Sequence, residues 1–159
     1  GEAWQIDQGY ELYYECRFTR TDADISCFVG LSASDASAIA GLVNGIGFKT
    51  VAAVLNTVCD NAGSTENVDA IAGVTIAALT WDRVAIHYDG VDTVKFYHAQ
   101  GDDEFVLVNT LLLSTTTDYV PQDLMMTPTL EAEEQTAAGA GSMYVDYVLV
   151  QQRRCRLAE

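Results

Sequence analysis

The chain has 159 residues and a mass of 17.2 kDa, and its 8 basic residues against 23 acidic ones give it a net charge of −15. This length suits one domain with its own core, and a hydrophobic content of 49% excludes a disordered acidic tail. An isoelectric point near 4.1 argues against nucleic acid or an anionic membrane surface as a partner, because both attract clustered Lys and Arg. The longest uncharged run, Phe105 to Thr117, has 13 residues and is too short to span a membrane.

Alternation of apolar and polar residues dominates the chain and is typical of half-buried β-strands. Along Tyr10–Phe18 every second residue is apolar, whereas Glu11, Tyr13, Glu15 and Arg17 fall on the opposite face. The segment Ile25–Leu31 alternates in the same way, and the six-residue, mostly polar loop between the two segments predicts an antiparallel hairpin. Further strands are predicted at Ile46–Thr50, Ala52–Val58, Ile71–Leu79, Arg83–Tyr88, Thr93–His98, Glu104–Asn109, Thr127–Glu133 and Met143–Gln151.

The number of strands and the lack of alternating helices predict an all-β sandwich or barrel, and an antiparallel β-sandwich is favoured. Met143–Gln151 is apolar on nearly both faces, so it either lies inside a sheet or turns one face to an interface. Ser34 or Asp35 can cap one short helix that ends near Gly41, and Pro128 can begin an edge strand. We expect a single domain over residues 1–152, followed by a short basic tail over 153–159.

The two histidines, His87 and His98, lie on successive predicted strands joined through Asp89-Gly90. The apolar residues of these strands place His87 on the outer face of the sheet and His98 on the inner face. Residues of a metal site or a Ser-His-Asp site must converge within hydrogen-bond reach. We therefore expect a surface histidine and a core or rim histidine, and no metal or catalytic site built on them.

Two groups of acidic and amide residues could form a functional site, one catalytic and one calcium-binding. Glu131, Glu133 and Glu134 could supply the paired carboxylates of a glycoside hydrolase, but their order lacks the required alternation with apolar residues, so a solvated strand end is favoured. A second group offers the hard oxygen atoms that Ca²⁺ takes, in a spacing that matches no known calcium loop. Its members are Asp60, Asn61, Glu66, Asn67 and Asp69. An exposed acidic loop is the favoured interpretation.

The cysteines are Cys16, Cys27, Cys59 and Cys155, and none forms the C-x-x-C pair of a zinc or thioredoxin-like site. The predicted hairpin would place Cys16 opposite Cys27. Buried free thiols are favoured over a disulfide, because directly opposed strand positions fit the bond poorly. Near the end of the sequence, Arg153, Arg154 and Arg156 form a basic group that is either a solubilising tail or a docking segment for an acidic partner.

Several segments together resemble the concanavalin A-like (laminin G-like) jelly-roll proteins found among the virion components of tailed phages. The resemblance covers nearly the whole chain and is carried by Tyr14–Phe18, Phe28–Ser32, Gly45–Phe48, Thr80–Val84, Asp89-Gly90, Val94–Tyr97, Thr127–Leu130 and Tyr144–Val148. The calcium-binding aspartate pair of laminin G-like lectins has no counterpart in this sequence.

This resemblance implies a non-enzymatic capsid decoration (cement) protein of a bacteriophage, without a cofactor. Such a protein would bind the major capsid protein on the outer surface of the virion and stabilise the shell, and we expect it to self-associate as a dimer or trimer. The candidate interface residues are Tyr13, Tyr147, Arg153, Arg154 and Arg156, since Tyr and Arg are enriched at interfaces. The alternative is a lectin-like module of a phage fibre or secreted protein, in which Trp4 or Trp81 would stack on a glycan.

Overall fold

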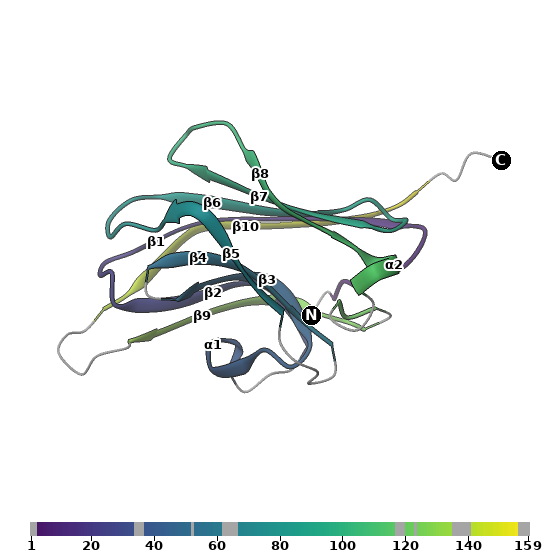
Figure 1. The fold of residues 1–159 in the computed structure, drawn as a ribbon, viewed down its shortest axis with the longest axis horizontal. Helices are drawn as coiled ribbons and strands as arrows, with labels where there is room; N and C mark the ends of the chain where they lie inside the picture. The colour runs from purple at the N-terminus through teal and green to yellow at the C-terminus, as the bar shows by residue number, and fades with distance from the viewer. Residues whose placement is uncertain are drawn as a thin grey trace.

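The computed structural model describes residues 3–33, 37–51, 53–61, 67–116, 120–122, 124–134 and 141–155. Within them, two five-stranded antiparallel sheets pack face to face (Figure 1). One sheet has the order β10-β1-β6-β7-β8 and the other β5-β4-β3-β2-β9. The predicted antiparallel β-sandwich is confirmed.

The strands are β1 (Tyr10–Arg20), β2 (Ile25–Ser32), β3 (Gly45–Val51), β4 (Val54–Asp60), β5 (Asn67–Thr75), β6 (Asp82–Tyr88), β7 (Thr93–Gln100), β8 (Val106–Leu112), β9 (Thr127–Glu134) and β10 (Met143–Arg154). The helices α1 (Ala38–Gly41) and α2 (Leu113–Thr116) have four residues each. Neither of these described helices is long enough to cross a membrane. All ten predicted strands overlap observed ones, because alternation reports faithfully which segments have one buried face.

The predicted β1–β2 hairpin is wrong, because the two strands belong to different sheets. The buried side chains of both strands contribute to the same core, from opposite layers. Alternation shows which side chains of a strand are buried. The pattern is the same whether the next strand lies beside it in one sheet or opposite it in the facing sheet. The chain crosses between the sheets at Arg20, whose buried guanidinium donates through Nη1 to the carbonyl of Ile25 at 2.6 Å and through Nη2 to that of Ile76.

Strand β2 is buried on both faces, because α1 covers the side that points away from the main core. Ser37 caps α1 by accepting a hydrogen bond from the amide of Ala40, a role predicted for Ser34 or Asp35, which lie outside the described residues. Beneath the helix, Phe28 packs in a second hydrophobic cluster. The other members of this cluster are Ala38, Ile39, Leu42 and Val58.

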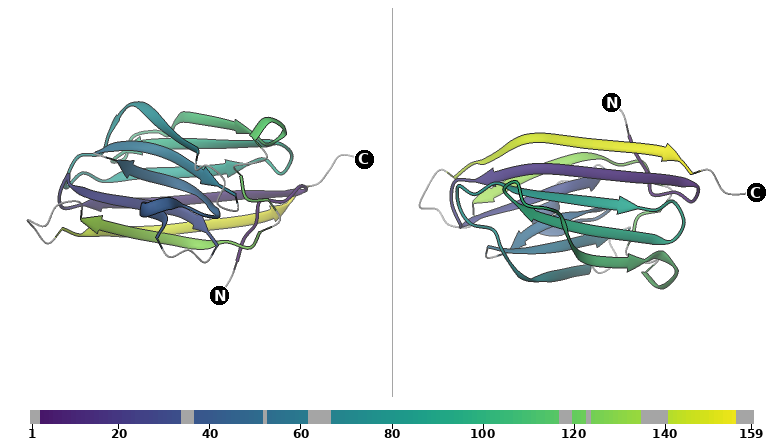
Figure 2. Two further views of the ribbon diagram at one scale, coloured as in Figure 1. Left: turned by 60° about the horizontal axis from the view of Figure 1, so that its bottom comes forward. Right: turned by 90° about the horizontal axis from the view of Figure 1, so that it is seen from above.

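Strands β10 and β8 form the two rims of their sheet (Figure 2, right). The expectation that the last strand could lie inside a sheet is therefore wrong, since β10 pairs with β1 alone among the described strands. Strand β10 also runs to Arg154, so Arg153 and Arg154 belong to the strand rather than following it. Pro128 lies in β9, an edge strand of the other sheet, as predicted.

The four cysteines are free thiols, and all four lie in the described part of the chain. Cys16 on β1 and Cys27 on β2 are both buried but occupy facing sheets rather than opposed positions of one hairpin. Burial raises the pKa of Cys16 to about 12 and that of Cys27 to about 11, so both remain protonated at neutral pH. The favoured interpretation of buried thiols is confirmed.

Candidate binding face

The outer side of the β10-β1-β6-β7-β8 sheet carries a dense group of polar and aromatic side chains, which we call the candidate face. Strand β1 forms its centre, because the alternation along Tyr10–Arg20 buries one row of side chains and turns the other outward. The register of the neighbouring strands places further residues beside that row. The candidate face consists of Glu11, Tyr13, Glu15, Arg17, His87, Tyr97, Phe105, Tyr147, Gln151 and Arg153.

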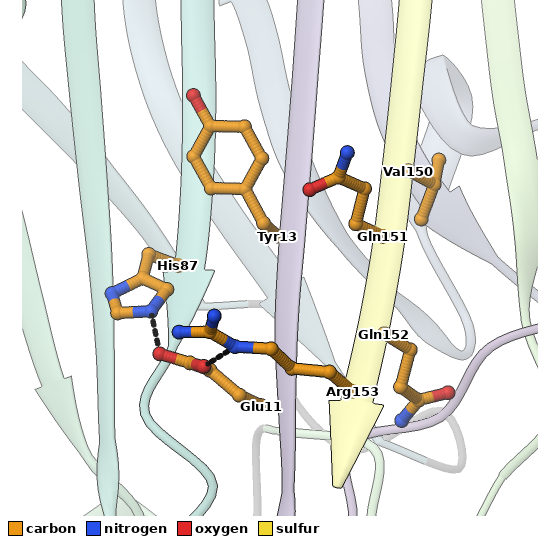
Figure 3. Close-up of a pocket in the computed structure, with 7 residues that line it drawn as sticks. All are labelled: Glu11, Tyr13, His87, Val150, Gln151, Gln152 and Arg153. Carbon is orange, nitrogen blue, oxygen red and sulfur yellow. Dashed lines mark hydrogen bonds and ion pairs between the residues drawn. The ribbon is translucent and has the colours of Figure 1, made fainter. Parts of the chain in front are cut away.

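Glu11 joins the two ends of a charged cluster on this face (Figure 3). Its Oε1 lies 3.0 Å from Nε2 of His87, and its Oε2 accepts a hydrogen bond from Nε of Arg153. The hydrogen bond from Arg153, followed by that from His87, holds the pKa of Glu11 below its ordinary value. Glu11 is thus held as a carboxylate with both oxygen atoms engaged. The cluster forms one wall of a shallow groove of about 600 Å³, together with Tyr13 and Gln151.

Glu15 forms a second cluster one step along β1. The hydroxyl of Tyr13 donates to its Oε2 at 2.6 Å, and the hydroxyl of Tyr147 donates to its Oε1. Burial and the neighbouring carboxylate raise the pKa of Tyr13 and of Tyr147. Both tyrosines therefore stay protonated and locked to one acceptor, so their rings have fixed orientations on the surface.

An aromatic hollow of about 290 Å³ lies beside this cluster, between β1, β6 and β7. Its lining residues are Tyr13, Ala85, His87, Tyr97 and Phe105. The rings of Tyr97 and Phe105 meet edge to face with centroids 6.5 Å apart, and the guanidinium of Arg83 lies 4.9 Å from the centroid of Phe105. These contacts hold the rings in place from behind and leave the hollow open to solvent.

Arg17 completes the candidate face at the opposite end of β1. Its Nη1 lies 3.0 Å from Oδ2 of Asp146, and its Nη2 lies 3.7 Å from Oδ1 of Asp102. The same guanidinium stacks over Trp81 with 5.1 Å to the ring centroid. Arg17, like Glu11 and Glu15, thus has polar or charged partners at the sheet surface, and these contacts hold the side chains of the candidate face in fixed positions.

The structure gives each histidine a carboxylate partner that the sequence analysis did not identify. His87 lies on the outer face and His98 on the inner face, as predicted, but His87 contacts Glu11 and His98 contacts buried Asp82, with 2.8 Å between Nε2 and Oδ1. Both contacts depend on which strands are neighbours. The alternation of Glu11 with the buried residues of β1 indicates that Glu11 faces outward, which is the only sequence signal for its contact with His87. It does not show that β6 lies beside β1.

Glu131 has a structural role on β9, where it anchors the start of α1. Its Oε1 accepts a hydrogen bond from Oγ of Ser37 at 2.7 Å, and its Oε2 accepts from the amides of Ala38 at 2.6 Å and Ile39 at 3.1 Å. Glu133 and Glu134 are exposed at the end of the same strand. The expected solvated strand end thus holds for Glu133 and Glu134 but is wrong for Glu131, because the start of α1 binds its carboxylate.

Other predicted sites lie partly or wholly outside the described residues. Glu66 and Arg156 fall there, and the side chains of Asn67 and Asp69 are not described. Asp60 is buried. Among the described residues, no group of three or more His, Cys, Asp or Glu side chains could hold a metal ion. Of the candidate interface residues, Tyr13, Tyr147 and Arg153 lie on the candidate face, and Arg154 is exposed at the end of β10.

Comparison with solved structures identifies the architecture. A family 7 alginate lyase in complex with its product matches with a TM-score of 0.55 and 8% identity, over 96% of this chain and 66% of that one. The fold is a concanavalin A-like jelly roll. A native heptameric SAP-like pentraxin from Limulus polyphemus matches at a TM-score of 0.48 and 12% identity, over 88% of this chain and 63% of the pentraxin. An ancestral congerin matches at 0.44 and 14% identity, over 93% of this chain and 95% of the congerin.

At 8% identity the likeness to the lyase shows the fold and nothing about activity. The chain spans less than two thirds of the pentraxin and about two thirds of the lyase. No protein-family model matches the sequence, and a search of curated proteins finds no match. Function therefore has to be argued from the surface of the molecule itself.

Proposed function

We propose that this chain is a non-enzymatic decoration (cement) protein of a bacteriophage capsid. In this proposal it binds the major capsid protein on the outer surface of the shell through the candidate face, and it stabilises the shell by doing so. The sequence resemblance described above motivates the choice of partner. The structural support comes from the candidate face, which is broad, rigid and aromatic.

The observation that carries the proposal is that both carboxylates of the candidate face are held in place by neighbouring side chains. Glu11 is held by His87 and Arg153, and Glu15 by Tyr13 and Tyr147. A surface whose side chains are already ordered loses little conformational entropy when it docks against another protein. Tyrosine rings supply contact area at such surfaces and are enriched among residues that dominate binding energy.

The charge of the chain fits the same role. A net charge of −15 keeps free copies soluble and apart before they reach a shell. A protein that binds only the assembled shell shifts the equilibrium toward assembly, in proportion to its affinity and concentration. Cementing therefore needs no chemistry from the bound protein, only a surface that contacts more than one shell subunit.

The test uses empty shells assembled from the major capsid protein encoded in the same genome. We expect the purified chain to bind these shells and to raise the temperature at which they open. The double variant Tyr13→Ala with Tyr147→Ala should bind at least tenfold more weakly, because it removes two ordered rings of the candidate face. Leu130→Ala, an exposed apolar residue on β9 of the other sheet, is the control. Shells that neither bind the chain nor gain heat resistance contradict the proposal.

A glycan-binding function is the second candidate, favoured by the aromatic hollow. Rings of Tyr13, Tyr97 and Phe105 around a small open cavity offer the stacking surface and hydroxyl groups that a sugar ring uses. Trp4 and Trp81 are only half exposed, and Trp81 lies under Arg17. A reproducible hit on a glycan array that Tyr97→Ala abolishes would favour this function over shell binding.

A further inference from the structure

We infer that a groove between the two sheets binds a small amphiphilic amine, that is, an ammonium group on an apolar body. The groove lies between β5 and β8, the strands at which the two sheets end on this side of the sandwich (Figures 1 and 2). Its volume is about 430 Å³. Its described lining residues are all different from those of the candidate face, so the inference goes beyond the proposed function and does not depend on it.

The walls of the groove are apolar and come from both sheets. Two residues of β5 and three of β8 contribute to them, namely Ile71, Val74, Val106, Leu107 and Val108. The register shift between β7 and β8 leaves Val108 without a paired residue on β7. Irregularities of this kind often lie beside binding sites. Hollows of roughly 300–1,000 Å³ with mainly apolar walls are typical of small-molecule sites, so the ligand has an apolar body.

The ring of His98 adds a polar group to this apolar groove. His98 lies opposite Val106 in the register of β7 and β8, and its side chain is 12% exposed. Its Nε2 lies 2.8 Å from Oδ1 of Asp82, a fully buried carboxylate. Because a carboxylate accepts hydrogen bonds, Nε2 carries the proton of this contact, and Nδ1 of the neutral ring is an acceptor. Among the described residues Nδ1 makes no hydrogen bond, so it is available to a ligand that donates one.

Asp82 shows that the charge behind His98 is incompletely compensated. Its second oxygen, Oδ2, is buried and has no hydrogen-bond partner within the described part of the chain. The buried guanidinium of Arg20 attracts Asp82, but its Nη1 and Nη2 donate to the carbonyls of Ile25 and Ile76. A buried carboxylate that lacks partners costs free energy, and a further positive charge nearby reduces that cost. An ammonium that donates to Nδ1 of His98 supplies such a charge.

The rim of the groove selects the same sign of charge. Asp103 and Glu104, in the turn before β8, line the groove with exposed carboxylates. Arg83 contacts this turn through the main-chain carbonyls of Gly101 and Asp103, which leaves the two carboxylates themselves to attract a cation. The same carboxylates repel an anionic head group. An ammonium group has three N–H donors, which Nδ1 of His98 and the rim carboxylates can accept.

Titration calorimetry of the purified chain with three probes of equal length tests the inference. Hexylammonium, hexanol and hexanoate share the apolar body and differ in the charge of the head group. We expect hexylammonium to bind at a single site, hexanol to bind at least tenfold more weakly, and hexanoate not to bind. Absent binding of hexylammonium at millimolar concentration, or equal binding of all three probes, overturns the inference. Tighter binding of lysine blocked at both ends would assign the groove to a protein side chain and overturn it as well.

Two matched variants locate the binding site. Asp103→Asn with Glu104→Gln removes both rim carboxylates and should weaken hexylammonium binding roughly fivefold, as the loss of two exposed ion pairs does. Glu133→Gln with Glu134→Gln removes the same charge from exposed positions on β9 and should leave the affinity unchanged. Equal weakening in the two variants would mean that the probe responds to net charge alone, and would contradict the inference.

Nuclear magnetic resonance of the wild-type chain gives a readout that does not depend on a variant. On titration with hexylammonium, the amide signals of Val106–Val108 and the ring signals of His98 should shift. The amide signals of Tyr13 and Tyr147 on the candidate face should stay in place. Shifts centred on the candidate face would overturn the inference. Because shells are absent from these experiments, their failure leaves the proposed capsid function untouched.

Discussion

The outer faces of the two sheets are built from the same kind of alternating strand but differ in what covers them. On the β5-β4-β3-β2-β9 sheet, α1 closes over Phe28, and this ring lies so near Gly47 that a Cβ atom there would come within 2.8 Å of it. On the β10-β1-β6-β7-β8 sheet, the outward row of β1 remains at the surface, where Tyr13 donates to Glu15 and His87 contacts Glu11. One outer face has become a second core, whereas the other has stayed a surface.

This difference shows where the fold has freedom to carry function. A face under a helix must keep its shape and volume, because interiors are close-packed and tolerate few changes. A solvent-facing sheet can change its side chains at little cost in stability, and its flat backbone holds them in fixed relative positions. This contrast supports the proposal that the candidate face binds a partner, whereas the covered face contributes to stability.

The largest change in unfolding free energy is expected when one aromatic residue of the covered face is replaced, compared with one of the candidate face. Phe28→Ala removes a fully buried ring beneath α1 and should lower the free energy of unfolding by about 3–5 kcal/mol. Phe105→Ala, in the open aromatic hollow, should lower it by no more than about 1 kcal/mol. Urea denaturation followed by circular dichroism measures both. An equal loss of unfolding free energy in the two variants would contradict the difference between a covered face and an exposed one.

The two histidines sharpen the same contrast within one hairpin. His98→Ala removes the partner of buried Asp82 and should cost about 1–3 kcal/mol of unfolding free energy. His87→Ala leaves Glu11 its contact with Arg153 at the surface and should cost less than about 1 kcal/mol. Thermal or urea unfolding of the two variants side by side is the measurement. A larger loss for His87→Ala would contradict the assignment of inner and outer roles.

The smallest effect is a pH dependence on the candidate face. Arg153 and then His87 lower the pKa of Glu11 from 4.5 in the folded state, so this carboxylate adds stability above its ordinary pKa. The added stability is lost as the pH falls through the lowered folded-state value. The difference in unfolding free energy between wild type and Glu11→Gln should therefore shrink as the pH falls below 4.5. A difference that stays constant or grows on acidification would contradict this origin, and high salt should reduce it.

The sequence predicted the ten strands because each has at least one buried face that alternation reveals. It could not show which strands lie side by side. A β1–β2 hairpin would bury the same side chains as the observed crossing between the sheets at Arg20. For the same reason the pattern of β10 left open whether the strand lies inside a sheet or turns one face to an interface, and in the structure it lies at an edge. The exposed row of Glu11, Tyr13, Glu15 and Arg17 was found, but its partners were not. His87 and Arg153 reach Glu11 only through the lateral order β10-β1-β6, which no local pattern encodes.

Electron cryomicroscopy of capsid shells incubated with the chain is the direct test of the proposed docking through the candidate face. The proposal predicts density for the sandwich on the outer surface of the shell, with β10, β1 and β6 turned toward the major capsid protein. Bare shells at saturating protein, or density in which the covered face with α1 makes the contact, would contradict it.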